Sequence, residues 1–110
     1  MFTVKKRFEV AGSHKLNLPY ESKCQNIHGH NWIITVTCQS DTLDDSGMVT
    51  DFSVIKKEIS DVLDHKHLND ILPFNPTAEN IAEWICHKIP NAVSVTVQES
   101  EGNEATYETL

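Results

Sequence analysis

The sequence has no run of apolar residues long enough to span a bilayer, so we expect no transmembrane helix and no membrane partner. Its start is unlike a signal peptide, because Phe2 and Val4 precede the charged residues 5–7 and no apolar core follows. The 110 residues contain no linker, repeat or low-complexity stretch, and this length is typical of one domain. We therefore expect a single domain over residues 1–110.

Positive charge is also scarce. The chain has 9 Lys and Arg against 16 Asp and Glu, which gives a net charge of −7 at pH 7. An acidic chain is a poor general partner for nucleic acid, so we expect no nucleic-acid binding. A phosphorylated ligand would have to be held by a local cluster of cations or backbone amides.

Cysteine is the third scarcity. Only Cys24, Cys38 and Cys86 are present, and no two of them lie close together in the sequence. This arrangement argues against a disulfide framework, and we expect a cytoplasmic protein. Cys38 and Cys86 fall within apolar patterns, and we assign no chemistry to either.

What is present is a clear alternation of apolar and polar residues, which predicts half-buried strands. A polar stretch rich in Asn, Pro, Ser and Lys separates the first two strands and predicts a loop over residues 15–27. The four predicted strands cover residues 2–11, 28–39, 92–99 and a short segment around Ala105 and Tyr107.

Between the second and third strands the apolar spacing changes to 3.6 residues and predicts two helices. Ser53 and Thr77 are the candidate N-caps, and Pro90 ends the second helix. The order is then ββααββ. We expect an α+β fold with a four-stranded antiparallel sheet and both helices on one of its faces.

Three histidines indicate a metal site. His28 and His30 are two residues apart in a strand and share a face, and His14 follows the first strand with the parity of its apolar face. Three neutral imidazoles with an open fourth position suit zinc. Judged by spacing alone, a metal site and a chance pair of histidines on an exposed strand explain His28 and His30 about equally well. The apolar stretch that follows favours the metal, because a lone imidazole there would need a partner.

Cys24 lies four residues before His28. Thiolates are favoured near cations, so Cys24 is a candidate fourth ligand, nucleophile or proton-transfer residue, unless it is an ordinary loop cysteine. Asp64 and His65 end the first predicted helix, and a carboxylate beside an imidazole suits proton transfer. From the local pattern alone, a structural role for His65 at the helix C-terminus is the better interpretation.

Glu99 shares the strand parity of Val95 and Val97, so its carboxylate should emerge at the end of an apolar face. A ligand that offers two N–H groups side by side would satisfy such a carboxylate. If the strand ends earlier, Glu99 faces water.

The run Cys24-Gln25-Asn26-Ile27-His28-Gly29-His30 resembles the signature of the 6-pyruvoyl-tetrahydropterin synthase and 6-carboxytetrahydropterin synthase superfamily. Further matches follow in the same order along nearly the whole chain. They cover Phe8 to His14, Gly47 to Phe52, Leu63 to His65, Leu68 to Asn69, Pro76 to Asn80, and Val95 to Glu99.

The resemblance implies zinc held by His14, His28 and His30. It implies proton transfer by Cys24 together with Asp64 and His65. It implies that Glu99 anchors the amino-pyrimidine edge of a pterin and can join the proton relay as a catalytic residue, and it places Thr77 in contact with the pterin as a substrate-binding residue. The implied fold is the tunnelling fold, in which trimers close their sheets into a barrel and often pair into homohexamers with active sites between subunits.

The implied substrate is 7,8-dihydroneopterin triphosphate. The three-residue gap between Cys24 and His28 resembles the bacterial 6-carboxytetrahydropterin synthases of the queuosine pathway. These zinc-dependent lyases release acetaldehyde and triphosphate. Two alternatives stay open: a 6-pyruvoyl-tetrahydropterin synthase that eliminates triphosphate, and a non-catalytic module that binds a pterin or zinc.

Overall fold

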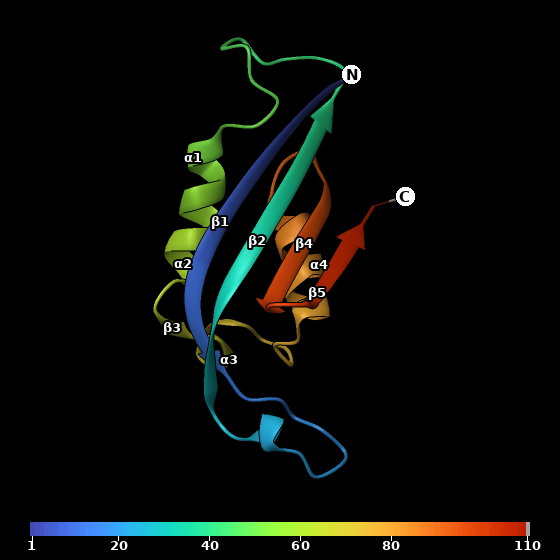
Figure 1. Ribbon diagram of the computed structural model, residues 1–110. Helices are drawn as coiled ribbons and strands as arrows, with labels where there is room; N and C mark the ends of the chain where they lie inside the picture. Colours follow the sequence, from blue (N-terminus) through green and yellow to red (C-terminus); the bar gives the residue numbers. More distant parts are fainter. Residues whose placement is uncertain (110) are drawn as a thin grey trace.

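The computed structural model describes residues 1–109 as an α+β fold in which the helices lie behind a single sheet (Figure 1). The strands follow one another across the sheet in the order β3-β1-β2-β4-β5. Neighbours are antiparallel except β1 and β3, which are parallel. The strands are β1 (Phe2–His14), β2 (His28–Ser40), β3 (Lys66–His67), β4 (Ala92–Ser100) and β5 (Asn103–Glu108).

The predicted four-stranded antiparallel sheet and the order ββααββ are therefore wrong in one respect. The four long strands are present, but β3 adds a short parallel edge strand between the helices. Two residues are too few to show any periodicity. Their position depends on a tertiary contact, the hydrogen bond that the His65 N–H donates to the Ala11 carbonyl at 2.7 Å.

The helical part is also more divided than two helices. The first helical stretch consists of α1 (Phe52–Ile55), the π-helical turn η2 (Lys56–Ser60) and α2 (Asp61–Leu63), and is followed by α3 (Leu68–Ile71) and α4 (Ala78–Lys88). Asp51, not Ser53, is the first N-cap, because its side chain accepts from the Ser53 N–H. Thr77 caps α4 as predicted. Among residues 1–109, no helix combines the length and apolarity needed to cross a bilayer.

One apolar core joins the helices to the sheet. Side chains of alternate residues in the strands enter it, as the alternation predicts, and Ile55, Ile59 and Leu63 enter it from the helical stretch at intervals of four residues. The sheet contributes Val10, Trp32, Ile34, Val36, Val95 and Val97, all at most 1% exposed.

The register between β1 and β2 brings the histidines to the same end of this core. His14 pairs with His28, and Gly12 pairs with His30. Trp32 follows on the same face, donates its indole N–H to the Gly12 carbonyl at 3.1 Å and is almost fully buried. The candidate site therefore lies where the apolar face of the sheet ends.

Candidate metal centre and adjoining cavities

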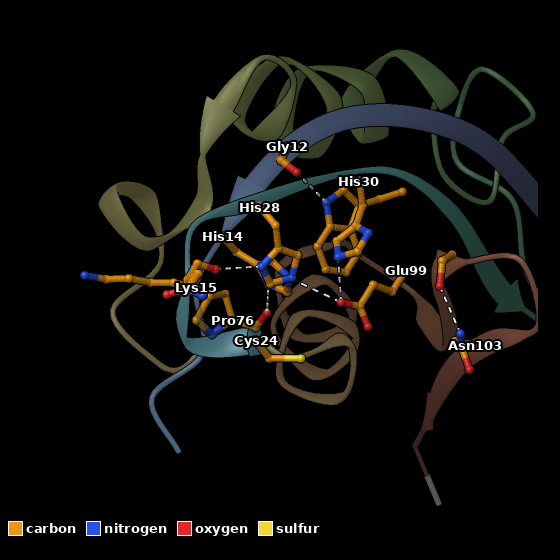
Figure 2. A network of polar contacts seen from close by, with 12 residues as sticks. Gly12, His14, Lys15, Cys24, His28, His30, Pro76, Glu99 and Asn103 are labelled. Carbon is orange, nitrogen blue, oxygen red and sulfur yellow. Dashed lines mark hydrogen bonds and ion pairs between the residues drawn. The ribbon is translucent and has the colours of Figure 1, made fainter. Parts of the chain in front are cut away.

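The rings of His14, His28 and His30 meet in T-shaped contacts at the end of the sheet (Figure 2). One ligand atom from each of them, and one from Glu99, lie within 4.8 Å of one another. His14 is buried, whereas His28 and His30 are half-buried. The ring of Trp32 packs against the rings of His14 and His30, with distances between ring centroids of 4.9 and 5.2 Å. Trp32 therefore supports two of the three imidazoles.

Backbone carbonyls determine the tautomer of two of these histidines. The Nδ1 of His14 is 2.8 Å from the carbonyl of Pro76, and the Nδ1 of His28 is 2.7 Å from that of Asn26. A carbonyl only accepts, so each Nδ1 carries the proton and donates. In the neutral rings, each Nε2 is therefore left with a free lone pair. This is the arrangement by which proteins orient metal-binding imidazoles.

The two free lone pairs face each other. The Nε2 atoms of His14 and His28 are 3.0 Å apart, a distance at which two acceptors repel unless a cation lies between them. A second proton on His14 is disfavoured. Burial lowers the pKa of His14 and the nearby His28 lowers it further, and together they outweigh the Pro76 carbonyl, which raises it. The donor set and its geometry therefore fit a metal ion.

Cys24 is held beside the histidines by an ordered turn within the predicted loop. It lies in η1 (Lys23–Gln25), which Ser22 and Gln25 close with a capping box. The Cys24 thiol is free and half-buried. A cavity of about 670 Å³ is lined by Cys24 together with Lys23, His28, His30 and Glu99. The structure thus brings Cys24, His28 and His30 to one cavity, with His14 buried behind them.

Asp64 and His65 are joined to each other but lie elsewhere. His65 Nδ1 is 3.1 Å from Asp64 Oδ2, and Asp64 Oδ1 accepts from the Ala11 N–H at 2.8 Å. His65 has a φ of 60°, a left-handed conformation that turns the chain from α2 into β3. Its side chain is 82% exposed and lines a second cavity, of about 500 Å³. His30 lines both cavities, and Cys24 lines only the first.

Comparison with known proteins assigns this arrangement to a family. The family model described as 6-pyruvoyl tetrahydropterin synthase matches residues 3–109. The chain belongs to the 6-pyruvoyl tetrahydropterin synthase family. The resemblance seen in the sequence motifs is thereby confirmed.

Several similar proteins match this chain over most of their own length. A 6-carboxy-5,6,7,8-tetrahydropterin synthase of Synechocystis is 37% identical, over 97% of this chain and 93% of the relative. A Bacillus subtilis protein of the same name is 29% identical, over 96% and 84%. The solved structure of 6-pyruvoyl tetrahydropterin synthase from Caenorhabditis elegans matches with a TM-score of 0.77 at 28% identity, over 99% and 96% of the two chains.

Within this family fold, Thr77 has a structural task. Its hydroxyl accepts from the Asn80 N–H at 3.1 Å and caps α4, while the neighbouring Pro76 carbonyl is the group that touches His14. The sequence interpretation missed Pro76 and also Lys23, the cation beside Cys24 in the first cavity. The position of Lys23 next to Cys24 was a usable signal, whereas nothing local pointed to Pro76.

The Asp64 carboxylate allows a prediction about pH. The Ala11 N–H lowers the pKa of Asp64, desolvation opposes this, and His65 lowers it further. The pKa of Asp64 is therefore lower in the folded protein than in the unfolded chain, where it is about 3.9. The charged carboxylate stabilises the fold at pH values above this unfolded-state pKa, and the stabilisation is lost as the pH falls through the folded-state pKa. We expect Asp64→Asn, which keeps the shape but not the charge, to lower the free energy of unfolding at neutral pH.

Urea unfolding at a series of pH values measures this effect. The difference between wild type and Asp64→Asn should shrink toward zero in acid, where both side chains are uncharged. The exposed Asp45→Asn serves as the matched control and should follow the wild-type curve. A difference that stays constant with pH would contradict the assigned role of the carboxylate.

Proposed function

We propose that this protein is a zinc-dependent lyase that converts 7,8-dihydroneopterin triphosphate and one water to 6-carboxy-5,6,7,8-tetrahydropterin, with release of acetaldehyde and triphosphate. The observation that carries the proposal is the pair of facing Nε2 lone pairs of His14 and His28, next to a cavity that His28 and Cys24 both line. Family membership and the names of the Synechocystis and Bacillus subtilis relatives support the reaction class. The product would serve queuosine biosynthesis, in the cytoplasm.

Each residue of the set has a chemical task in this proposal. His14, His28 and His30 would hold zinc, which when bound polarises side-chain hydroxyls of the substrate. Cys24 would remove and return protons at the carbons beside those hydroxyls. Asp64 would hold His65 in the tautomer needed to exchange protons with Cys24.

The protein would recognise both ends of the substrate, the pterin ring and the triphosphate. The Glu99 carboxylate would accept both N–H groups of the amino-pyrimidine edge of the pterin. Thr77, which caps the helix next to Pro76, would contribute by holding that wall of the site in place. Lys23 is the cation that the first cavity offers to the triphosphate of a substrate in an otherwise acidic chain.

We further propose that neighbouring copies complete the site, in a homohexamer built from two trimers. This is supported by the separation of Cys24 and His65, which line different cavities of one chain. It is supported also by the sheet. Within residues 1–109, the outer edge of β5 has no strand beside it, and β1 pairs with β3 through only Gly12 and Ser13. Such edges invite pairing with another chain.

Product analysis tests the reaction. The zinc-loaded protein is incubated with 7,8-dihydroneopterin triphosphate, and the products are identified by mass spectrometry. We expect 6-carboxy-5,6,7,8-tetrahydropterin and acetaldehyde in equal amounts. Triphosphate without acetaldehyde would instead support a 6-pyruvoyl tetrahydropterin synthase, the activity named for the Caenorhabditis elegans structure. An unconsumed substrate would overturn the proposal and favour a non-catalytic pterin- or zinc-binding module.

A further inference from the structure

The carboxylate of Glu99 lies against the histidines at the wall of the first cavity. Its Oε1 is 2.8 Å from the Nε2 of His30 and 3.2 Å from the Nε2 of His14 (Figure 2). Its side chain is 29% exposed. Glu99 has the strand parity of Val95 and Val97, so β4 directs it to the face of the sheet on which they lie. The pairing of β4 with β5 shifts register at this point, between Gln98 and Ser100.

These contacts are not satisfied as hydrogen bonds. His14 donates from Nδ1 to Pro76, so its Nε2 has no proton to offer Glu99, and two acceptors meet at 3.2 Å. The Nε2 of His30 is buried and makes no hydrogen bond of acceptable geometry, although Glu99 is 2.8 Å away. Glu99 therefore extends the cluster of lone pairs that His14 and His28 begin.

The four ligand atoms of His14, His28, His30 and Glu99 lie within 4.8 Å of one another, close enough to share one metal ion. A tetrahedral zinc ion with ligands at about 2.0–2.2 Å places neighbouring ligand atoms roughly 3.3 Å or slightly more apart. The three contacts measured here, His14 to His28, His14 to Glu99 and Glu99 to His30, are 3.0, 3.2 and 2.8 Å, somewhat shorter than this spacing. Three imidazoles alone would leave one position open, and Glu99 Oε1 is the further ligand atom within reach of it.

We propose that Glu99 is a fourth, exchangeable metal ligand in the substrate-free protein. The inference rests on the proposed metal site and substrate. A carboxylate that accepts the two N–H groups of an amino-pyrimidine edge no longer offers the same oxygen to the metal. Binding of the pterin ring and opening of the fourth coordination position are thus coupled through one side chain, and the metal is exposed to the substrate hydroxyls only once the ring is bound.

Cobalt(II) and zinc binding to the purified protein test this inference. The visible absorption spectrum of the cobalt form reports the ligand set, and competition with a chromophoric chelator reports zinc affinity. We expect Glu99→Gln to change the cobalt spectrum and to weaken zinc binding by at least about 10-fold, because even a group that only orients a ligand contributes about 10- to 100-fold. Glu101→Gln, in the exposed turn two residues on, is the matched control and should match wild type.

A second arm uses pterin itself, which has the amino-pyrimidine edge but no side chain. Added to the wild-type cobalt protein, it should shift the spectrum toward that of Glu99→Gln, and it should leave the spectrum of the variant unchanged. Identical wild-type and Glu99→Gln spectra would overturn the inference and leave the three-histidine site standing. A wild-type protein that binds neither metal would overturn the proposed function itself. Circular dichroism of both variants establishes that they are folded.

Discussion

Replacing His14 by alanine is expected to reduce bound zinc from one ion per chain to none. His14 is the buried member of the cluster, and its Nε2 faces both His28 and Glu99. The change also removes the donor to the Pro76 carbonyl, and a buried acceptor left without a partner costs about 1–3 kcal/mol. Metal analysis of the purified protein and urea unfolding with and without a chelator measure both effects.

The chelator separates metal loss from simple destabilisation. A metal at 100 times its Kd adds about 2.7 kcal/mol to the free energy of unfolding. That increment should disappear from wild type when the chelator is added, and it should be absent from His14→Ala throughout. His87→Ala is the matched control, because His87 is exposed and contacts Tyr107 far from the cluster. Stoichiometric zinc in His14→Ala would show that the cluster is not the metal site.

Cys24→Ala is expected to lower turnover of 7,8-dihydroneopterin triphosphate by about 10²- to 10⁴-fold, the usual contribution of a positioned proton-transfer group. The thiol lies in the cavity beside the histidines but outside their cluster, so zinc content should stay at one ion per chain. The turn that holds it should survive, because Ser22 and Gln25 close it without the thiol. Steady-state kinetics and metal analysis on one preparation measure both quantities.

Ile27→Ala is the control for this variant. Ile27 belongs to the same loop, and its side chain is 66% exposed. We expect it to turn over substrate at the wild-type rate. If Cys24→Ala did the same while wild type remained active, Cys24 would not be the proton carrier. A loss of zinc in Cys24→Ala would instead make the thiol a metal ligand, one of the roles that the sequence left open.

Much of the fold could be read from the sequence because side-chain alternation is a local property. The parity of His28, His30 and Trp32 within one strand, and of Glu99 with Val97 in another, placed these residues on one face before any contact was known. The cap at Thr77 followed from its position before an apolar helical pattern. The motif around Cys24 indicated the family, which the comparison confirmed.

Errors arose where a local signal was weak or ambiguous. Asp51 and Ser53 are two residues apart, and both are residue types that favour the N-cap. Asp51 is the N-cap of α1, because its carboxylate accepts hydrogen bonds from both the N–H and the hydroxyl of Ser53. The strand β3 has two residues and depends on hydrogen bonds to β1, more than fifty positions earlier in the chain.

The sequence by itself determined which residue types share a face and which family the chain resembles. Only the tertiary structure decided which atoms meet. The proton on His14 is placed by the carbonyl of Pro76, 62 residues away, and no local pattern encodes such a contact. The same holds for the contacts of Glu99 with His14 and His30, and for His65, which the approach to Ala11 places in a separate cavity. Local periodicity sets the direction of a side chain, but long-range packing sets the partner it reaches.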